Sequence, residues 1–169
     1  MKKNSKELAS CYKKLLQNGH NSDVIIRFDQ GDDLKELYAH SLILRARSNF
    51  FDSALFSRWA RKEGKIFIIE MKDVSINIFK AVLRYIYTTE ISLDELSGVE
   101  ILEILVETDR LQLLIEGFNR KLISYVRENL EEIIRNDAIK TLQIIFQFNN
   151  IFETLHGSCL QLICAYPNM

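Results

Sequence analysis

Three histidines are the side chains best suited to act as a general base or a metal ligand near neutral pH. His20, His40 and His156 lie far apart, and none has the HxH or HExxH spacing that places two zinc ligands on one helical face. His40 precedes Ser41, and Asp23 would supply the third member of a hydrolase triad. Adjacent residues at a strand-to-helix corner point in different directions, so the sequence argues against this nucleophilic site.

The other patterns that could do chemistry are weaker still. The six glycines form neither GxGxxG nor GxxxxGK[ST], so no phosphate-binding loop is predicted. A basic cluster in the middle of the chain lacks an RNP-like aromatic series or a zinc knuckle, which favours a protein partner over nucleic acid. Its members are Arg45, Arg47, Arg58, Arg61, Lys62 and Lys65. We expect no enzyme, cofactor or metal, and a site built from scattered residues is the minor alternative.

Composition and charge point to a protein that binds other proteins inside the cell. The 22 basic and 23 acidic side chains nearly cancel, so overall charge attracts neither nucleic acid nor an anionic membrane. The apolar runs are far shorter than a membrane span, and the charged start is unlike a secretory signal. Cys11, Cys159 and Cys164 lack CxxC spacing, which indicates reduced, buried or half-buried thiols. We expect a cytoplasmic location, with the nucleus as the alternative.

The elements that would position these residues begin with a helix and a hairpin. Residues 5–17 carry an apolar stripe, and Asn18-Gly19 ends the helix. Residues 23–29 alternate between apolar and polar, the turn chemistry of residues 30–33 follows, and residues 34–39 return as the second strand. Leu37 and Ala39 are its expected inward positions. Residues 58–65 are predicted to be a loop, and residues 66–69 a central strand, because they are apolar on both faces.

The rest of the chain has a helical period. Two short helices follow His40, and Ser48 is the expected N-cap of the second. After Val74 the pattern predicts a long helix, then a capping box over residues 97–100 that opens a helix to residue 108, then a helix over residues 111–126. Residues 130–135, 137–148 and 152–164 predict a C-terminal helical annex, with the weakest junction near residues 128–129.

The order of several short motifs resembles a BTB/POZ domain. These are Ser22-Asp23-Val24, Ala39-His40, Leu42-Ile43-Leu44, Arg47-Ser48, Phe51, Phe56, Lys72-Asp73-Val74, Phe79, Leu83, Tyr85-Ile86-Tyr87-Thr88 and Asp109-Arg110-Leu111-Gln112-Leu113. The resemblance implies an α+β fold in which a small mixed sheet is flanked by a helical cluster. The expected organisation is a dimerisation helix over residues 1–19, a BTB/POZ domain over residues 20–127 and a helical region over residues 128–169. This last region is similar to the opening of a BACK domain, as in fungal BTB-BACK-TLDc proteins.

The resemblance also assigns structural residues and a dimer surface. Asp23 and His40 are expected to support the corner where the chain enters and leaves the hairpin, and Ser48 to cap a helix. Repressor-type members place Arg or Lys after the corner His, whereas this chain has Ser41, which counts against co-repressor recognition of that kind. The implied homodimer contacts are Leu8, Tyr12, Leu15, Leu16 and Val24.

A second implied surface would contact a cullin. Cullin-binding members often carry a hydrophobic-x-Glu motif where this chain has Trp59, Ala60 and Arg61, so the acid is replaced by a base. Trp59 is interpreted either as an interface anchor or as a residue folded onto its own core. The expected contacts are Leu55, Trp59, Arg61 and Tyr87. Two hypotheses follow: a homodimeric adaptor that links a cullin-RING ubiquitin ligase to an unknown protein target, or a dimerisation scaffold without a ligase.

Overall fold

The computed structural model describes residues 2–30, 33–56, 60–115 and 117–165. The side chains of residues 2–5, 29, 30, 33 and 34 are outside this description. The chain divides into two compact units. Unit 1 contains residues 1–91 and 110–114, and unit 2 contains residues 92–109 and 115–169. In this division residues 92–109 group with the later helices.

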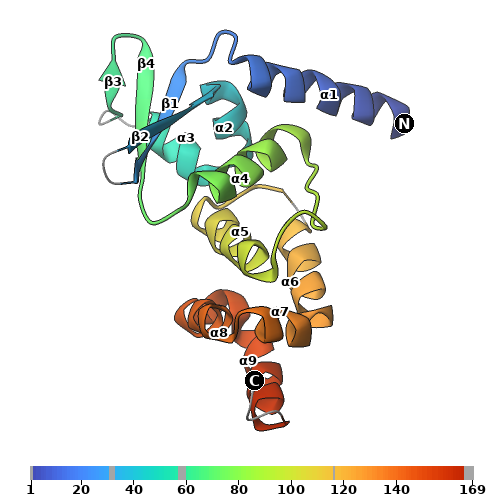
Figure 1. Cartoon of the computed structure of the whole chain (residues 1–169). Coiled ribbons are helices and arrows are strands. Elements are labelled where there is room, and N and C mark those ends of the chain that lie inside the picture. Colours follow the sequence, from blue (N-terminus) through green and yellow to red (C-terminus); the bar gives the residue numbers. More distant parts are fainter. Residues whose placement is uncertain (1, 31–32, 57–59, 116, 166–169) are drawn as a thin grey trace. The chain divides into compact units, whose positions relative to one another are not determined.

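Unit 1 is built on a four-stranded mixed sheet (Figure 1). The strands are β1 (Val24–Gln30), β2 (Asp33–Ala39), β3 (Lys62–Glu63) and β4 (Ile66–Met71), in the order β2-β1-β4-β3. β1 pairs with β2 antiparallel and with β4 parallel, and β3 pairs with β4 antiparallel. The predicted hairpin and the predicted internal strand are therefore confirmed. The predicted loop before that strand is partly wrong, because Lys62 and Glu63 form β3.

The apolar face of the sheet follows from the alternation in β1. Val24, Ile26 and Phe28 are completely buried, and Phe28 meets Phe79 edge to face with 5.1 Å between ring centroids. Phe79 belongs to α4 (Ile76–Thr88), whose start is capped by Ser75. The alternate, inward-pointing side chains of β1 thus pack against the apolar stripe of α4 in one core.

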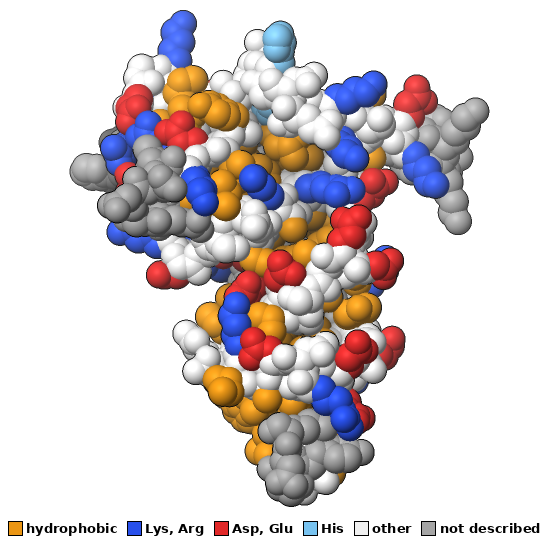
Figure 2. Space-filling view, in the orientation of Figure 1, with side chains coloured by type: hydrophobic (Ala, Val, Ile, Leu, Met, Phe, Trp, Pro, Cys, Tyr) orange, Lys and Arg blue, Asp and Glu red, His pale blue; other side chains and the backbone are white. Residues whose placement is uncertain are grey.

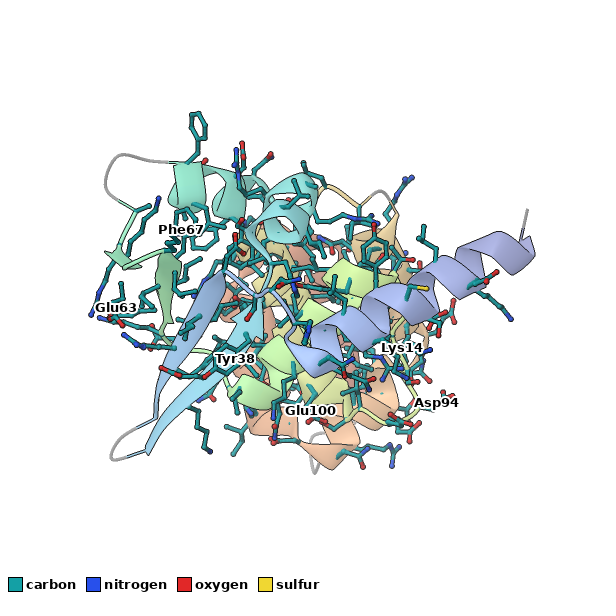
Figure 3. The ribbon with its side chains drawn as sticks, turned by 90° about the horizontal axis from the view of Figure 1, so that it is seen from above. Lys14, Tyr38, Glu63, Phe67, Asp94 and Glu100 are labelled. Carbon is teal, nitrogen blue, oxygen red and sulfur yellow. The ribbon has the colours of Figure 1, made fainter. Side chains whose placement is uncertain are left out.

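The remaining helices of unit 1 are α1 (Lys2–Asn18), α2 (Ser41–Arg47) and α3 (Asn49–Phe56). Gly19 ends α1 with φ +58°, and its N–H donates to the Leu15 carbonyl over 3.2 Å. The carboxyl-terminal part of α1 packs against α4, while the amino-terminal end extends past α4 in Figures 1 and 3. The three predicted helices in this part of the chain are confirmed.

The regular secondary structure in the described part of unit 2 is helical. The helices are α5 (Gly98–Arg110), α6 (Phe118–Glu128), α7 (Leu130–Asn136), α8 (Ala138–Gln147) and α9 (Asn149–Ala165). The capping box is confirmed, since the Ser97 N–H donates to Glu100 over 2.8 Å and the Glu100 N–H donates to the Ser97 hydroxyl over 3.3 Å. The helix predicted over residues 111–126 is wrong in its first part. Residues 111–115 are outside any helix, and residues 110–114 belong to unit 1.

Candidate interaction surfaces

The corner between the hairpin and α2 is held by hydrogen bonds. The Asp23 carboxylate accepts from the Ser41 N–H over 2.7 Å and from the Ser41 hydroxyl over 2.5 Å. Asp23 precedes β1 and Ser41 opens α2, so this carboxylate joins the start of the sheet to the start of a helix. The Ser41 hydroxyl donates to Asp23 and not to His40, so the arrangement lacks the proton relay of a hydrolase triad.

Both ring nitrogens of His40 have partners in this corner. Nε2 lies 2.8 Å from the His20 carbonyl oxygen, and Nδ1 lies 2.8 Å from the Tyr87 hydroxyl. The network assigns the proton to Nε2, because a carbonyl can only accept, and Tyr87 then donates to Nδ1. The same hydroxyl accepts from the His40 N–H over 2.9 Å. Burial raises the pKa of Tyr87 above the ordinary range for a phenol, so the hydroxyl keeps its proton.

Ser48 joins three segments of unit 1. Its buried hydroxyl donates to the Leu111 carbonyl over 2.6 Å and accepts from the Phe51 N–H over 3.2 Å, as the predicted N-cap requires. Residues 48 and 113 form an isolated β-bridge, and the Leu114 N–H donates to the Arg47 carbonyl over 2.9 Å. The segment after α5 therefore turns at residues 111–112 and bonds the end of α2 and the start of α3. This pairing is the physical reason that the segment is not helical.

The predicted dimer residues occupy different environments. Leu8 is 58% exposed, and Tyr12, Leu15 and Leu16 are half-buried. Val24 is completely buried inside its own subunit, so its side chain is not on any surface that a second copy could touch. A groove of about 140 Å³ lies beside Tyr12, and its other lining residues include Leu42, Ile43, Ala46 and Ile86. Leu42 is 80% exposed, and the sequence reasoning did not select it.

Two of the four predicted cullin contacts are inaccessible. Leu55 is 5% exposed and Tyr87 is 2% exposed, which is the wrong environment for a surface contact. Trp59 lies outside the described residues. Arg61 is exposed, but it forms ion pairs with Glu70 and Glu63.

Phe56, the last residue of α3, is an exposed aromatic side chain in this region. It is 76% exposed, and the Arg45 guanidinium lies 5.1 Å from its ring centroid. Arg45 is itself fixed by Asp52 over 2.8 Å. In the sequence, Phe56 stands out only as part of the BTB/POZ resemblance, because an apolar pattern in a short helix does not show which of its faces is left uncovered.

A charged network crosses the outer face of the sheet. Arg27 on β1 bonds Glu36 on β2 over 2.9 Å and holds Glu63 on β3 with two bonds of 2.8 and 3.1 Å. The Arg27 guanidinium lowers the pKa of Glu63, so this carboxylate stays charged and remains bonded to Arg27. Figure 2 shows acidic and basic side chains interspersed over this part of unit 1, and Figure 3 places Glu63 at the β3 side of the sheet.

The cysteines are free thiols in two different settings. Cys159 is buried, and burial raises the pKa of its thiol. Cys11 and Cys164 are exposed, so the expectation that all three are buried or half-buried was wrong for these two. In the described part of the chain no three His, Cys, Asp or Glu side chains are grouped to hold a metal ion. The described helices include none with the length and apolar character of a membrane span.

Comparison with known proteins settles the family. The family model described as "BTB/POZ domain" matches residues 12–129. The chain belongs to the BTB/POZ family. The BTB domain of zebrafish PATZ1 has the same fold, with a TM-score of 0.53, 22% identity, and coverage of 78% of this chain and 95% of that domain. The predicted α+β BTB/POZ fold is confirmed.

Two curated relatives carry the family name. One is BTB/POZ and MATH domain-containing protein 6 of Arabidopsis thaliana, 36% identical over 81 residues, which are 48% of this chain and 18% of that protein. The other is BTB/POZ domain-containing protein 19 of Bos taurus, 32% identical over 99 residues, which are 59% of this chain and 33% of that protein. The match thus spans a third or less of these relatives. BTB/POZ domains are in general interaction modules without enzymatic activity that typically self-associate and bind other proteins, and as a member of this family the chain carries a protein–protein interaction module.

Proposed function

We propose that this BTB/POZ chain forms a homodimer through α1 and α2, and that the dimer links a cullin-RING ubiquitin ligase to a protein target. The observation that carries the dimer is the exposure of two leucines on neighbouring helices of unit 1. Leu8 is 58% exposed and Leu42 is 80% exposed, and Tyr12 lines the groove beside Leu42. A two-fold contact would let the α1 of each copy cover the other copy's groove, which removes apolar surface from water.

Light scattering tests the dimer directly. The wild-type chain should have a mass of about 40 kDa, twice the 19.8 kDa of one copy. Leu8→Asp combined with Leu42→Asp should return it to 19.8 kDa, because each partner would have to bury an unpaired carboxylate. Leu15→Asp should act in the same direction, but Leu15 is half-buried and the substitution would also strain the fold.

The matched control is Ile139→Asp. Ile139 on α8 is 75% exposed, so it carries the same change on a different helix in unit 2. Its mass should equal that of the wild type. A wild-type chain that stays monomeric at high concentration would contradict the dimer, and so would a double variant that remains dimeric.

The ligase part of the proposal rests on the end of α3. Phe56 is exposed, Arg45 holds its ring in place, and Arg61 lies a few residues further along. A fixed aromatic side chain beside arginines is typical of an interface anchor. The proposed place of this function is the cytosol or nucleus, and the proposed role of residues 128–169 is the start of a BACK domain.

A titration with the amino-terminal domain of a cullin decides this point. The wild-type chain should bind, and Phe56→Ala and Trp59→Ala should each weaken binding roughly ten-fold or more, as loss of an aromatic anchor does. Leu160→Ala is the control, since Leu160 on α9 is 53% exposed and lies in unit 2. Absence of binding by the wild type would remove the ligase from the proposal and leave the dimer untouched.

One observation favours the second candidate, a dimerisation scaffold without a ligase. Arg61 stands where cullin-binding relatives often have an acid, and Glu63 is the nearest carboxylate in sequence. Glu63 is held by two bonds from Arg27, so it cannot turn toward a partner without breaking the ion pair. A scaffold requires no acid at this position.

A further inference from the structure

The outer strand of the sheet has an unpaired edge. β2 pairs with β1 along seven residues, from Gln30 opposite Asp33 to Val24 opposite Ala39. Within the described residues no strand pairs with its other side. On an edge strand, alternate residues direct their N–H and C=O groups away from the sheet, where another strand can bond them. The pairing with β1 is regular throughout, so no bulge turns this edge away.

A groove runs beside this edge. Its volume is about 430 Å³, and it is bounded by β2, by the carboxyl-terminal end of α1 and by α4. Leu16, Leu37 and Leu83 give it an apolar lining. Tyr38 stands at the rim, is 50% exposed, and lies near Gly19 at the end of α1 (Figure 3). A groove of this kind accepts one apolar side chain of a strand laid along the edge.

Two charged side chains of opposite sign, Lys80 and Glu36, line the groove. Lys80 on α4 is exposed, and none of the described acidic residues forms an ion pair with it. Glu36 also lines the groove, but its carboxylate is bonded to Arg27 over 2.9 Å. Because the acid is paired and the lysine is not, the groove favours an occupant that carries a negative charge.

We propose that an extended segment of a partner protein pairs with the β2 edge and adds a fifth strand to the sheet. One of its apolar side chains enters the groove between Leu37 and Leu83, and an acidic side chain meets Lys80. Main-chain hydrogen bonds supply affinity, and the groove and Lys80 supply selectivity. This surface contains neither Leu8 nor Leu42, and it shares only Leu16, at the carboxyl-terminal end of α1, with the predicted dimer residues. The inference therefore goes beyond the proposed dimer.

Selection from a display library of random peptides of about ten residues, with the full chain as bait, tests the proposal. Enriched peptides should alternate apolar and polar residues and contain Asp or Glu. Fluorescence polarisation with the enriched peptides should show roughly five-fold weaker binding to Lys80→Glu, because the charge at the rim is reversed. Exchanging the peptide's acid for lysine should restore binding to that variant.

Two controls separate this surface from others. Lys65→Glu makes the same charge change at the β3–β4 turn and should bind like the wild type. N-methylation of the peptide at successive positions should weaken binding at every second residue, since an edge-paired strand uses alternate N–H groups.

Several outcomes would overturn the proposal. They are no enrichment over beads without the chain, equal binding by wild type and Lys80→Glu, and binding that N-methylation leaves unchanged. A fourth is a Lys80→Glu variant whose mass in light scattering is lower than that of the wild type. That result would mean that a second copy of the chain, and not a partner protein, occupies the β2 edge. The Leu8 and Leu42 double variant should still bind the peptides, so failure of the dimer and failure of this surface are distinguishable.

Discussion

Asp23→Ala should lower the free energy of unfolding by about 3 kcal/mol, roughly a 150-fold change in the unfolding equilibrium. The carboxylate accepts two short hydrogen bonds from Ser41, at 2.7 and 2.5 Å, and hydrogen bonds to charged groups contribute about 1.5–3 kcal/mol each. Its removal leaves the first N–H of α2 without a partner in a half-buried corner. Urea unfolding followed by circular dichroism measures the change.

The comparison variants separate geometry from charge. Asp23→Asn keeps one acceptor oxygen but loses the negative charge, so about half of the loss is expected. Asp94→Ala removes an exposed carboxylate with no hydrogen-bonded partner among the described residues and should change stability by less than about 0.5 kcal/mol. If Asp23→Ala were as mild as Asp94→Ala, the corner would not depend on this carboxylate.

Local patterns were sufficient for most of the secondary structure. The hairpin follows from alternation in residues 23–29. The C-terminus of α1 follows from Gly19, and the N-terminus of α5 follows from the Ser97–Glu100 capping box. At the two helix termini the deciding hydrogen bonds join residues within a few positions of one another, and the hairpin pairs two strands that are adjacent in the sequence. Sequence spacing therefore carries the necessary information.

One error in the fold comes from partners that are distant in sequence. Residues 111–115 have an apolar pattern compatible with a helix, yet their backbone bonds residues 47–49. Tertiary pairing outweighs helix propensity in this segment. The error at β3 has a different cause, because its partner β4 is only three to five positions away, across a turn at Gly64, and the charged residues Lys62 and Glu63 give no strand pattern. The bonds from Arg27 to Glu63 span 36 positions, and no local window contains both.

Exposure was the least predictable property of the candidate surfaces. Leu55 and Phe56 are neighbours on α3 with similar hydrophobicity, yet one is 5% exposed and the other 76%. Val24 and Tyr87 were expected at interfaces, and both are buried by elements far away in sequence. A periodic pattern shows which side chains share a face, but only the packing shows which face is covered.

Gly98→Ala should destabilise unit 2 by about 2 kcal/mol, within the range for overpacked cores. Gly98 is the first residue of α5, and a Cβ there would lie 2.3 and 2.7 Å from the two γ-carbons of Ile133 on α7. Such distances require the helices to shift or the isoleucine to leave its rotamer. Chemical unfolding measures the loss, and hydrogen exchange should place it in α5 and α7.

Gly157→Ala provides the matched control with the opposite sign. Gly157 is an exposed residue in the middle of α9, and an added Cβ would meet nothing within 4 Å. Alanine there should stabilise the chain by up to about 1 kcal/mol, because glycine is a poor residue for a helix interior. Equal effects of the two substitutions would show that helix propensity, and not contact with Ile133, determines the outcome.

A double variant tests whether Ile133 is the cause of the Gly98→Ala loss. Ile133→Ala removes both γ-carbons and leaves its own Cβ 2.9 Å from the new methyl group, so the clash should be relieved in part. Ile133→Ala alone should cost about 2–5 kcal/mol, because Ile133 is buried and a cavity remains. Gly98→Ala should fill some of that cavity, and the double variant should therefore lose less stability than the sum of the two single losses. A strictly additive result would mean that α5 and α7 do not meet at these two residues.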